Sequence, residues 1–199
     1  MFVKKTNGYV IRNNRISTTK FLQALLVDWI TDANVHFLNW VVVEDEKLCV
    51  QCKNMWGKVY KRHNLVFPLP PLHPHCRCTI QPIQIAIVGT ATNEKHNGAD
   101  WWIKSQGKLP DFYITYQEAV KLGFKPKEGN LDKVAPGKMI TRGQYFNRNE
   151  HLPEKPGRIW YEADINYSGG YRNSERILYS NDGLIFITLD HYRTFVEII

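Results

Sequence analysis

Two acids and two arginines are crowded into sixteen residues, EADINYSGGYRNSERI, whose alternation of polar and apolar side chains is typical of a β-hairpin. Glu162 and Asp164 precede the turn signal Ser-Gly-Gly, and Arg172 and Arg176 follow it. A carboxylate can accept or return a proton, and a guanidinium can make paired hydrogen bonds to phosphate oxygens. Gathered on one surface, these four side chains would therefore suit chemistry at a phosphate group.

The register of the hairpin decides whether they are gathered. We predict a three-residue loop, 168–170, with Tyr167 paired to Tyr171, because glycine supplies the positive φ that such turns require. In that register Glu162 lies opposite Arg176, and all four charges share one face. A two-residue loop would send the acids and the arginines to opposite faces. The competing interpretation is an ion-paired, solvent-exposed sheet face without chemistry.

A second group of reactive side chains comes earlier in the chain, as two close pairs of cysteines. They are Cys49, Cys52, Cys76 and Cys78. A Cys-x-x-Cys turn presents both sulfurs to one ion, so we predict that the four thiolates hold one structural zinc, with His63, His73 and His75 as nearby substitutes. Reduced cysteines packed in a core, and redox or disulfide use, are the alternatives. None of these interpretations makes this region an enzyme.

Length and composition predict a folded protein with an anionic partner. The 199 residues are 43% hydrophobic with a net charge of +7, which excludes an intrinsically disordered chain. Residues 1–107 carry 13 Lys and Arg against 7 acids, whereas residues 108–199 carry 13 against 12, so any attraction for phosphate in the second part must be local. The sequence shows neither a secretory signal nor an apolar run that could span a membrane, so we expect synthesis in the cytoplasm and no membrane partner.

The elements that must position these residues fall on two sides of a polar segment. HFLNWVVV (36–43) and TIQPIQIAIV (79–88) are typical of strands, whereas GTATNEKHNG (89–98) contains little that packs. We therefore predict an N-terminal α/β module over 1–88, a linker over 89–98 and a second domain over 99–199.

The second domain begins with helical patterns and continues with strand patterns. ADWWIKSQ (99–106) is amphipathic, and Thr115 followed by Glu118 is a capping-box pattern. Strand signals dominate from Ile140 onward, separated by Gly, Asn and Asp turns. Helices followed by an antiparallel meander predict an α+β domain.

The stretch CVQCKNMWGKVY…PPLHPHCRCTI resembles the C-terminal part of the minor head (head-morphogenesis) proteins of tailed phages. The match covers residues 44–80 and is specific at both cysteine pairs, Gly57, His73 and Pro74. The resemblance implies a fragment of a phage-head or secretion carrier in front of a cargo domain.

From Lys108 to Phe195 the chain resembles the barnase family, the small bacterial extracellular ribonucleases of the T1/N1 class. The segments that carry this resemblance are KLPDFYITYQEAVKLGF, GNLDKVAPGKMI, RIWYEADINYSGGYRNSERILYSNDGLIF and DHYRTF, in this order. It implies short helices packed on a twisted antiparallel sheet. It also implies cleavage of single-stranded RNA without a metal, first to a 2′,3′-cyclic phosphate and then by hydrolysis.

The resemblance assigns a role to each residue of the charged hairpin. Glu162 matches the general base, and His191 in DHY matches the general acid. Arg172 and Arg176 match the arginines that bind the phosphate, and Asp164 matches the buried acid that orients them. Because the attacking group is a 2′-hydroxyl, DNA is not a substrate.

The resemblance also predicts a preference for guanine. Asn147, Arg148 and Asn149 match the base-binding loop, and Tyr171 and Tyr192 match positions that contact a base. Asn149 departs from the family pattern, because an acid stands there in the family and accepts from both the N1 and N2 hydrogens of guanine.

A second departure concerns the phosphate. Tyr116 stands where the family has a lysine that helps to bind the scissile phosphate, so we expect weaker transition-state stabilisation unless another cation moves in.

These observations predict an endoribonuclease toxin that is delivered by a non-Sec route, acts in the cytoplasm of a target cell and is neutralised by a barstar-type inhibitor. The alternative is a phage structural or adaptor protein whose ribonuclease-like domain binds RNA or protein without cutting. Tyr116 and Asn149 favour the alternative, and the retained Glu162 and His191 count against it.

Overall fold

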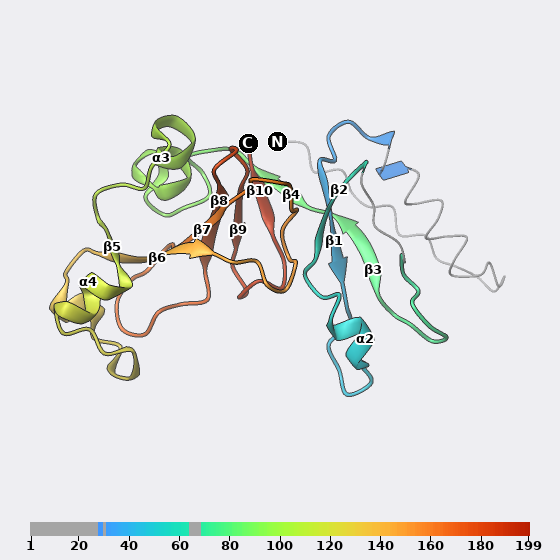
Figure 1. Cartoon of the computed structure of the whole chain (residues 1–199), viewed down its shortest axis with the longest axis horizontal. Coiled ribbons are helices and arrows are strands. Elements are labelled where there is room, and N and C mark those ends of the chain that lie inside the picture. Colours follow the sequence, from blue (N-terminus) through green and yellow to red (C-terminus); the bar gives the residue numbers. More distant parts are fainter. Residues whose placement is uncertain (1–27, 30, 64–68) are drawn as a thin grey trace.

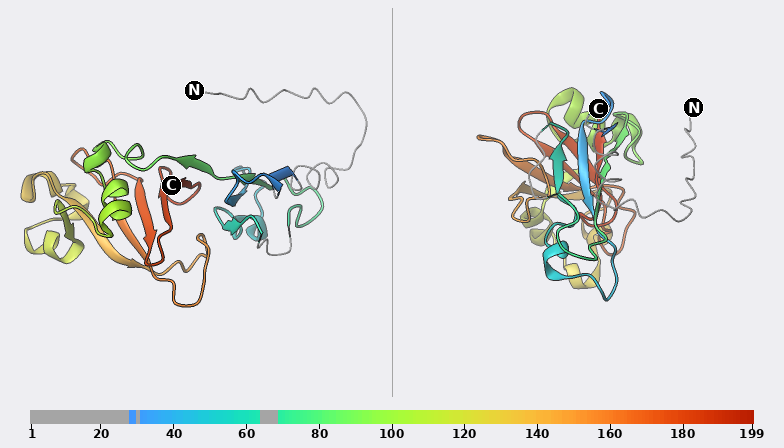
Figure 2. Two further views of the ribbon diagram at one scale, coloured as in Figure 1. Left: turned by 90° about the horizontal axis from the view of Figure 1, so that it is seen from above. Right: turned by 90° about the vertical axis from the view of Figure 1, so that its right-hand side faces the viewer.

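Two β-sheets organise the residues that this computed structural model describes, which are 28–29, 31–63 and 69–199 (Figure 1). The smaller sheet has the strand order β2-β1-β3, and the larger has the order β4-β10-β9-β8-β7-β6-β5. The two sheets lie side by side along the long axis of the molecule (Figure 2).

The small sheet consists of β1 (Phe37–Val41), β2 (Val59–Lys61) and β3 (Thr79–Pro82), all antiparallel. β1 confirms the strand predicted over 36–43. Its Leu38 and Trp40 are fully buried in a core that also contains all four cysteines and lies beside the short helix α2 (Val50–Lys53). We call residues 35–63 and 69–82 the small-sheet module.

The large sheet is mixed but mostly antiparallel. Its strands are β4 (Gln84–Ala86), β5 (Tyr113–Thr115), β6 (Met139–Tyr145), β7 (Trp160–Asp164), β8 (Arg176–Ser180), β9 (Ile185–Thr188) and β10 (Val196–Ile198). Only the outermost strands β4 and β5 run parallel to their neighbours. With its short helices, this sheet confirms the predicted α+β class.

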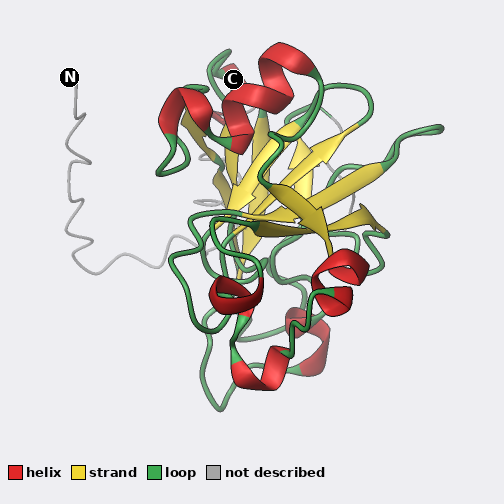
Figure 3. Ribbon diagram, turned by 90° about the vertical axis from the view of Figure 1, so that its left-hand side faces the viewer, coloured by secondary structure: helices red, strands yellow, loops and turns green. Residues whose placement is uncertain are grey.

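Short helices cover one face of the large sheet and one of its ends (Figure 3). They are η1 (Lys95–Asn97), α3 (Ala99–Gln106), α4 (Tyr116–Lys121), η2 (Pro126–Glu128) and α5 (Leu131–Val134). Helix α3 packs Ala99 and Ile103 against the isoleucine-rich face of β8 and β9. The predicted capping box at Thr115 and Glu118 is confirmed, since each side chain accepts a hydrogen bond from the other residue's backbone N–H.

The run 79–88, predicted as one strand, serves both sheets. β3 ends at Pro82 and β4 begins at Gln84, and the buried Ile83 between them enters a core that the two sheets share. Phe37 of β1 meets Phe186 of β9 edge-to-face, with ring centroids 5.1 Å apart. The small-sheet module and the large sheet are therefore joined by one apolar core as well as by the chain.

The segment 89–98 has internal structure of its own. The buried Asp100 accepts hydrogen bonds from the backbone N–H groups of Gly89 and Ala91, at 2.7 and 3.2 Å, and from the Thr92 hydroxyl at 3.0 Å. Strand β4, which precedes this segment, already pairs with β10. The division of the chain at 89–98 stays a prediction. Within the described ranges, no helix has both the length and the apolar character to cross a bilayer.

Candidate active site

The four charged residues of the hairpin share one face of the large sheet, but not in the register expected. Asp164 pairs with Arg176, and Glu162 pairs with Leu178, so the prediction that Glu162 lies opposite Arg176 is wrong. The observed pairing is shifted by two residues. Because side chains alternate with a period of two along a strand, that shift keeps all four charges on one face.

The loop between β7 and β8 is longer than predicted, and Asn173 explains why. Its side-chain amide donates to the carbonyls of Ile165 and Asn166, at 2.9 and 3.2 Å, and a turn confined to residues 168–170 would not include it. Tyr171 lies on this loop and is 70% exposed, and its hydroxyl donates to the carbonyl of Lys127 in η2. The hydrogen bond of Tyr171 thus directs its side chain toward η2, and its predicted contact with a base stays a prediction.

The charged face is buried, unlike the solvent-exposed face considered as the alternative. Glu162, Asp164 and Arg176 all have less than a tenth of their surface exposed. Arg172 donates two hydrogen bonds to Asp164, at 2.6 and 2.5 Å. Nε of Arg176 lies 3.1 Å from Asp164 and 3.6 Å from Glu162. Burial alone would lower the pKa of Arg172, but the hydrogen bonds and charge of Asp164 raise it above its ordinary value. Asp164 therefore fixes the position of both guanidinium groups and stabilises the charged form of Arg172.

His191 and Tyr192 lie on the loop between β9 and β10, and both have positive φ, 58° and 68°. The Asp190 carboxylate accepts from the backbone N–H groups of Arg193 and Thr194, at 3.1 and 2.9 Å. This left-handed conformation is unfavourable for side chains larger than glycine. The hydrogen bonds of Asp190 therefore stabilise a loop conformation that is intrinsically unfavourable for His191 and Tyr192.

Tyr192 connects this loop to the charged face. Burial, together with the charge of Glu162 and a hydrogen bond to it, raises the pKa of Tyr192 well above its ordinary value. The Tyr192 ring stacks on Tyr145, and its centroid lies 4.9 Å from that of His191. The predicted base and the predicted acid thus both contact one aromatic side chain.

The predicted base-binding residues lie on the loop after β6. Asn147 is buried, and its side-chain amide makes two hydrogen bonds with the backbone of Leu152, at 2.8 and 3.0 Å. It therefore shapes the loop and does not reach outward. Arg148 and Asn149 are exposed, as side chains that meet a ligand need to be.

Arg142 lies at a bulge in β6, in the strand next to β7, and no sequence pattern pointed to it. The pairing of β6 with β7 is irregular between Thr141 and Gly143, and Gly143 lies opposite Glu162. Bulges beside active sites commonly redirect one side chain. Here the Arg142 guanidinium lies 5.3 Å from the ring centre of Tyr116. Arg142 therefore supplies a positive charge beside Tyr116, whose own side chain carries none.

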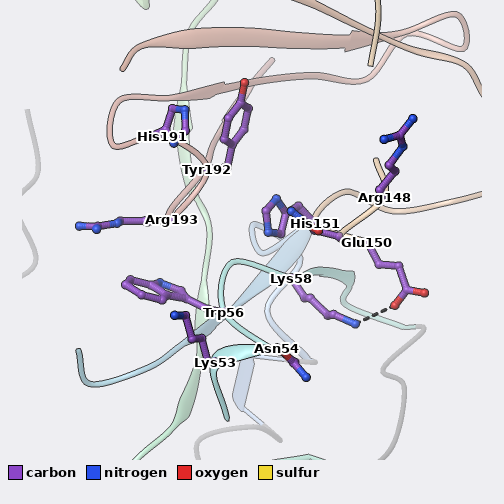
Figure 4. Close-up of a pocket in the computed structure, with 11 residues that line it drawn as sticks. Lys53, Asn54, Trp56, Lys58, Arg148, Glu150, His151, His191, Tyr192 and Arg193 are labelled. Carbon is purple, nitrogen blue, oxygen red and sulfur yellow. Dashed lines mark hydrogen bonds and ion pairs between the residues drawn. The ribbon is translucent and has the colours of Figure 1, made fainter. Parts of the chain in front are cut away.

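A groove of about 550 Å³ runs beside the predicted acid and the base-binding loop (Figure 4). Loops 148–151 and 191–193 form two of its sides, and residues 53–58 of the small-sheet module form the third. Lys58 donates to the Glu150 carboxylate at 2.7 Å and lowers the pKa of Glu150. The small-sheet module therefore contributes directly to the surroundings of the candidate active site.

The cysteine pairs come together around one histidine. His73 Nε2 lies 3.2 Å from the Cys49 sulfur and 3.1 Å from the Cys52 sulfur, and the sulfurs of Cys52 and Cys76 are 3.6 Å apart. His73 Nδ1 lies 2.8 Å from the Pro74 carbonyl. Because a carbonyl only accepts, Nδ1 must carry the proton, and Nε2 faces the two sulfurs with its lone pair. That is the orientation of a histidine ligand supported by its second nitrogen.

Two groups of possible ligands share Cys52. One consists of Cys49, Cys52 and His73, and the other of Cys52, Cys76 and Cys78. Separations near 3.6 Å are those expected between ligands that each lie about 2.0–2.3 Å from a tetrahedral zinc. The described histidines His63 and His75 belong to neither group.

Comparison with known proteins bears on the large-sheet domain. Residues 74–199 match the family described as ribonuclease. A stretch of 100 residues, half of this chain, is 50% identical to a ribonuclease of Heyndrickxia coagulans and covers 91% of that protein. Ribonucleases of Bacillus intermedius and Bacillus pumilus show the same identity over 100 residues, which cover 61% of their length. Residues 53–58, which line the groove, lie outside the matched segment.

Proposed function

The chain belongs to the ribonuclease family, and on that premise we propose that this endoribonuclease cleaves single-stranded RNA on the 3′ side of guanine without a metal. The observation that carries the proposal is the buried cluster of Glu162, Asp164, Arg172 and Arg176 beside the loop of His191. An ion-paired sheet face without chemistry would be exposed to solvent, whereas Glu162, Asp164 and Arg176 are buried and paired with one another.

Glu162 is the base in the mechanism that we propose. It takes the proton of the 2′-hydroxyl, and the 2′-oxygen forms a bond to phosphorus while the bond to the 5′-oxygen breaks. His191 returns a proton to that 5′-oxygen, so the first products are a 2′,3′-cyclic phosphate and a free 5′-hydroxyl. In the second step water attacks the cyclic phosphate with the two roles reversed.

The charge that develops on the phosphate oxygens requires fixed cations. Arg172 and Arg176 are fixed by Asp164, and neither needs to reorganise when the phosphate binds. Arg142 adds a third cation at the position of Tyr116. We propose that it replaces the charge that Tyr116 lacks.

The preference for guanine rests on the loop that Asn147 shapes. Its hydrogen bonds to Leu152 fix the backbone next to Arg148 and Asn149. Asn149 accepts through one oxygen only, and Glu150, the next acid along, is paired with Lys58. We therefore propose a guanine preference that is weaker than that of a loop with a carboxylate at residue 149.

The test uses the four dinucleotides GpU, ApU, CpU and UpU, with and without EDTA. We expect faster cleavage of GpU, a cyclic phosphate product and no requirement for added metal. Glu162→Ala and His191→Ala should each abolish cleavage in protein that still unfolds cooperatively, whereas Glu128→Ala and His96→Ala, which replace the same residue types elsewhere, should not. Equal cleavage of all four substrates would refute the guanine preference alone. No cleavage by folded wild-type protein would refute the enzyme and support the binding protein.

The cellular role that we propose is that of a toxin. An endoribonuclease active in its producer would degrade the producer's RNA, so we infer an inhibitor of the barstar type whose acidic side chains face Arg148, Arg172 and His191. The small-sheet module would belong to a carrier related to phage minor head proteins or to a secretion system, with delivery by a non-Sec route into the cytoplasm of a target cell. Cells that express the wild type should survive only with the inhibitor, whereas Glu162→Ala should be tolerated without it.

We also propose a structural zinc in the small-sheet module, which supports folding and not catalysis. The orientation of His73 Nε2 toward Cys49 and Cys52 favours these three ligands, with Cys76 as the fourth and Cys78 as the alternative fourth. Purified protein should contain one zinc per chain by elemental analysis. Loss of that zinc in Cys52→Ser and His73→Ala, with retention in Cys78→Ser, is expected; zinc-free wild-type protein that is fully folded would refute the site.

A further inference from the structure

We infer that one part of the groove, between residues 53–58 of the small-sheet module and residues 191–193, binds RNA on the 3′ side of the cleaved bond, whereas Arg148 and Asn149 on its other side are left to the guanine. This inference rests on the proposed function, because it takes His191 as the acid that protonates the leaving 5′-oxygen. The groove has a volume of about 550 Å³ and opens beside His191. One of its sides belongs to the small-sheet module, which lies outside the segment that matches the ribonuclease family.

The charges around the groove fit a polyanion. Its lining contains four cations, Lys53, Lys58, Arg148 and Arg193, against one acid, Glu150. That acid is already neutralised by Lys58 at 2.7 Å. The excess of positive charge therefore faces the open space, where it can attract a phosphate.

Trp56 and Arg193 give the groove a surface for a base. The Arg193 guanidinium lies 5.0 Å from the ring centre of Trp56, and in Figure 4 Arg193 lies between His191 and Trp56. Arg193 also contacts Glu44 at 3.2 Å, but both side chains are about half exposed, so that ion pair is weak and leaves the guanidinium accessible. Bases of single-stranded RNA stack on aromatic rings and on guanidinium planes.

Backbone contacts fix the module against both loops. The Val59 N–H donates to the His151 carbonyl at 2.6 Å. A Cβ atom on Gly57 would lie 2.5 Å from the Tyr192 carbonyl oxygen, so only glycine permits this approach. The small-sheet module is therefore held against the two loops, and it keeps its side of the groove in place.

The direction of the RNA follows from the position of the acid. The 5′-oxygen that His191 protonates belongs to the nucleotide after the cut, so that nucleotide leaves the charged face on the side of His191. Arg193 follows His191 by two residues in the same loop, and Trp56 lies under Arg193. The next phosphate and base therefore meet Lys53, Trp56 and Arg193.

The experiment compares kcat/KM for GpU, for GpUpU with one more nucleotide on the 3′ side, and for UpGpU with one more on the 5′ side. Wild-type protein should cleave GpUpU about tenfold better than GpU, as expected from one added stacking or phosphate contact. In Arg193→Gln and Lys53→Gln the ratio of GpUpU to GpU should fall toward one, and Arg193→Lys should retain part of it. Trp56→Phe should keep more of the ratio than Trp56→Ala. The control Lys61→Gln removes an exposed cation of the same module that does not line the groove, and it should leave every ratio unchanged.

The outcomes separate the inference from the proposed function. If wild-type protein cleaves GpU but shows the same GpUpU ratio as Arg193→Gln, the groove does not bind RNA and the ribonuclease remains. If the variants lose the advantage of UpGpU instead, the direction is wrong and the inference fails. The deoxy trinucleotide dGpdUpdU, which has no 2′-hydroxyl, tests binding without cleavage. Equal affinity of wild type and Arg193→Gln for it would overturn the inference even in a chain that cuts nothing.

Discussion

The contact between Gly57 and the loop of His191 offers a sharp test of how the small-sheet module affects the active site. Gly57 has a φ of +76°, and a Cβ atom there would lie 2.5 Å from the backbone carbonyl oxygen of Tyr192, whereas ordinary contact begins at 3.4 Å. In Gly57→Ala the two backbones must separate by roughly 1 Å, because neither can rotate away as a side chain would. The strained backbone costs about 1–2 kcal/mol and the overpacked contact about 1–3 kcal/mol.

The same displacement moves the loop that carries His191. A shift of about 1 Å in a catalytic group costs up to ~100-fold in rate, so we expect kcat/KM for GpU to fall between about tenfold and 100-fold. Urea unfolding should show a free energy of unfolding lower by about 2–5 kcal/mol, the sum of these two costs. Both quantities are measured on the same purified preparations.

Gly107→Ala is the matched control. Gly107 has a similar φ, +69°, but a Cβ atom there would meet nothing within 4 Å. Gly107→Ala therefore has the cost of the backbone conformation without the close contact. Its free energy of unfolding should fall by about 1–2 kcal/mol, and its activity should not change. If Gly57→Ala is no less stable and no less active than Gly107→Ala, the reasoning about the contact is refuted. If only stability falls, the module does not position the acid.

Three further predictions concern charged groups. Asp164→Asn leaves the buried guanidinium of Arg176 and the partly buried one of Arg172 without their shared partner and should lower the free energy of unfolding by about 3–5 kcal/mol in urea; an unchanged midpoint would contradict this. Arg142→Gln should lower kcat/KM for GpU about tenfold while Arg142→Lys keeps most of it, and equal rates for all three proteins would show that Arg142 plays no part. Burial raises the pKa of Glu197 above its ordinary 4.5 despite the hydrogen bond from His36, so stability from this carboxyl is present below pH 4.5 and is lost as the pH rises through the raised value. Glu197→Gln should therefore gain unfolding free energy relative to wild type as the pH rises above 4.5, and a pH-independent difference would contradict the assignment.

Alternation along the hairpin predicted the charged face correctly although the register was wrong. Which face a strand residue occupies depends only on whether its position is odd or even, so an error of two residues in pairing leaves Glu162 and Arg176 on the same side. The pairing itself depends on the hydrogen bonds that the Asn173 side chain donates to the carbonyls of Ile165 and Asn166, because they connect the two ends of the loop in the folded protein. Local turn statistics contain no information about them.

The parts of the site that the sequence did not reveal depend on contacts between distant segments. Arg142 reaches Tyr116 because β6 is irregular at that residue, and a bulge has no reliable signature in a single strand. Trp56 and Lys58 line the groove because β3 and β4 pass from one sheet to the other at Ile83. The pattern of residues 79–88 predicted strand structure but not that it divides between two sheets.

The pairing of β4 with β10 sets the order in which this molecule can be completed during its synthesis. Gln84 is made long before Val196, its partner in the sheet, and Phe37 must wait in the same way for Phe186. The small-sheet module can form early, but its docking surface stays uncovered until the last strand of the large sheet exists, and distant pairings of this kind form slowly. The groove needs both the small-sheet module and the loop of His191, so it cannot be assembled before residues 186–198 have been made.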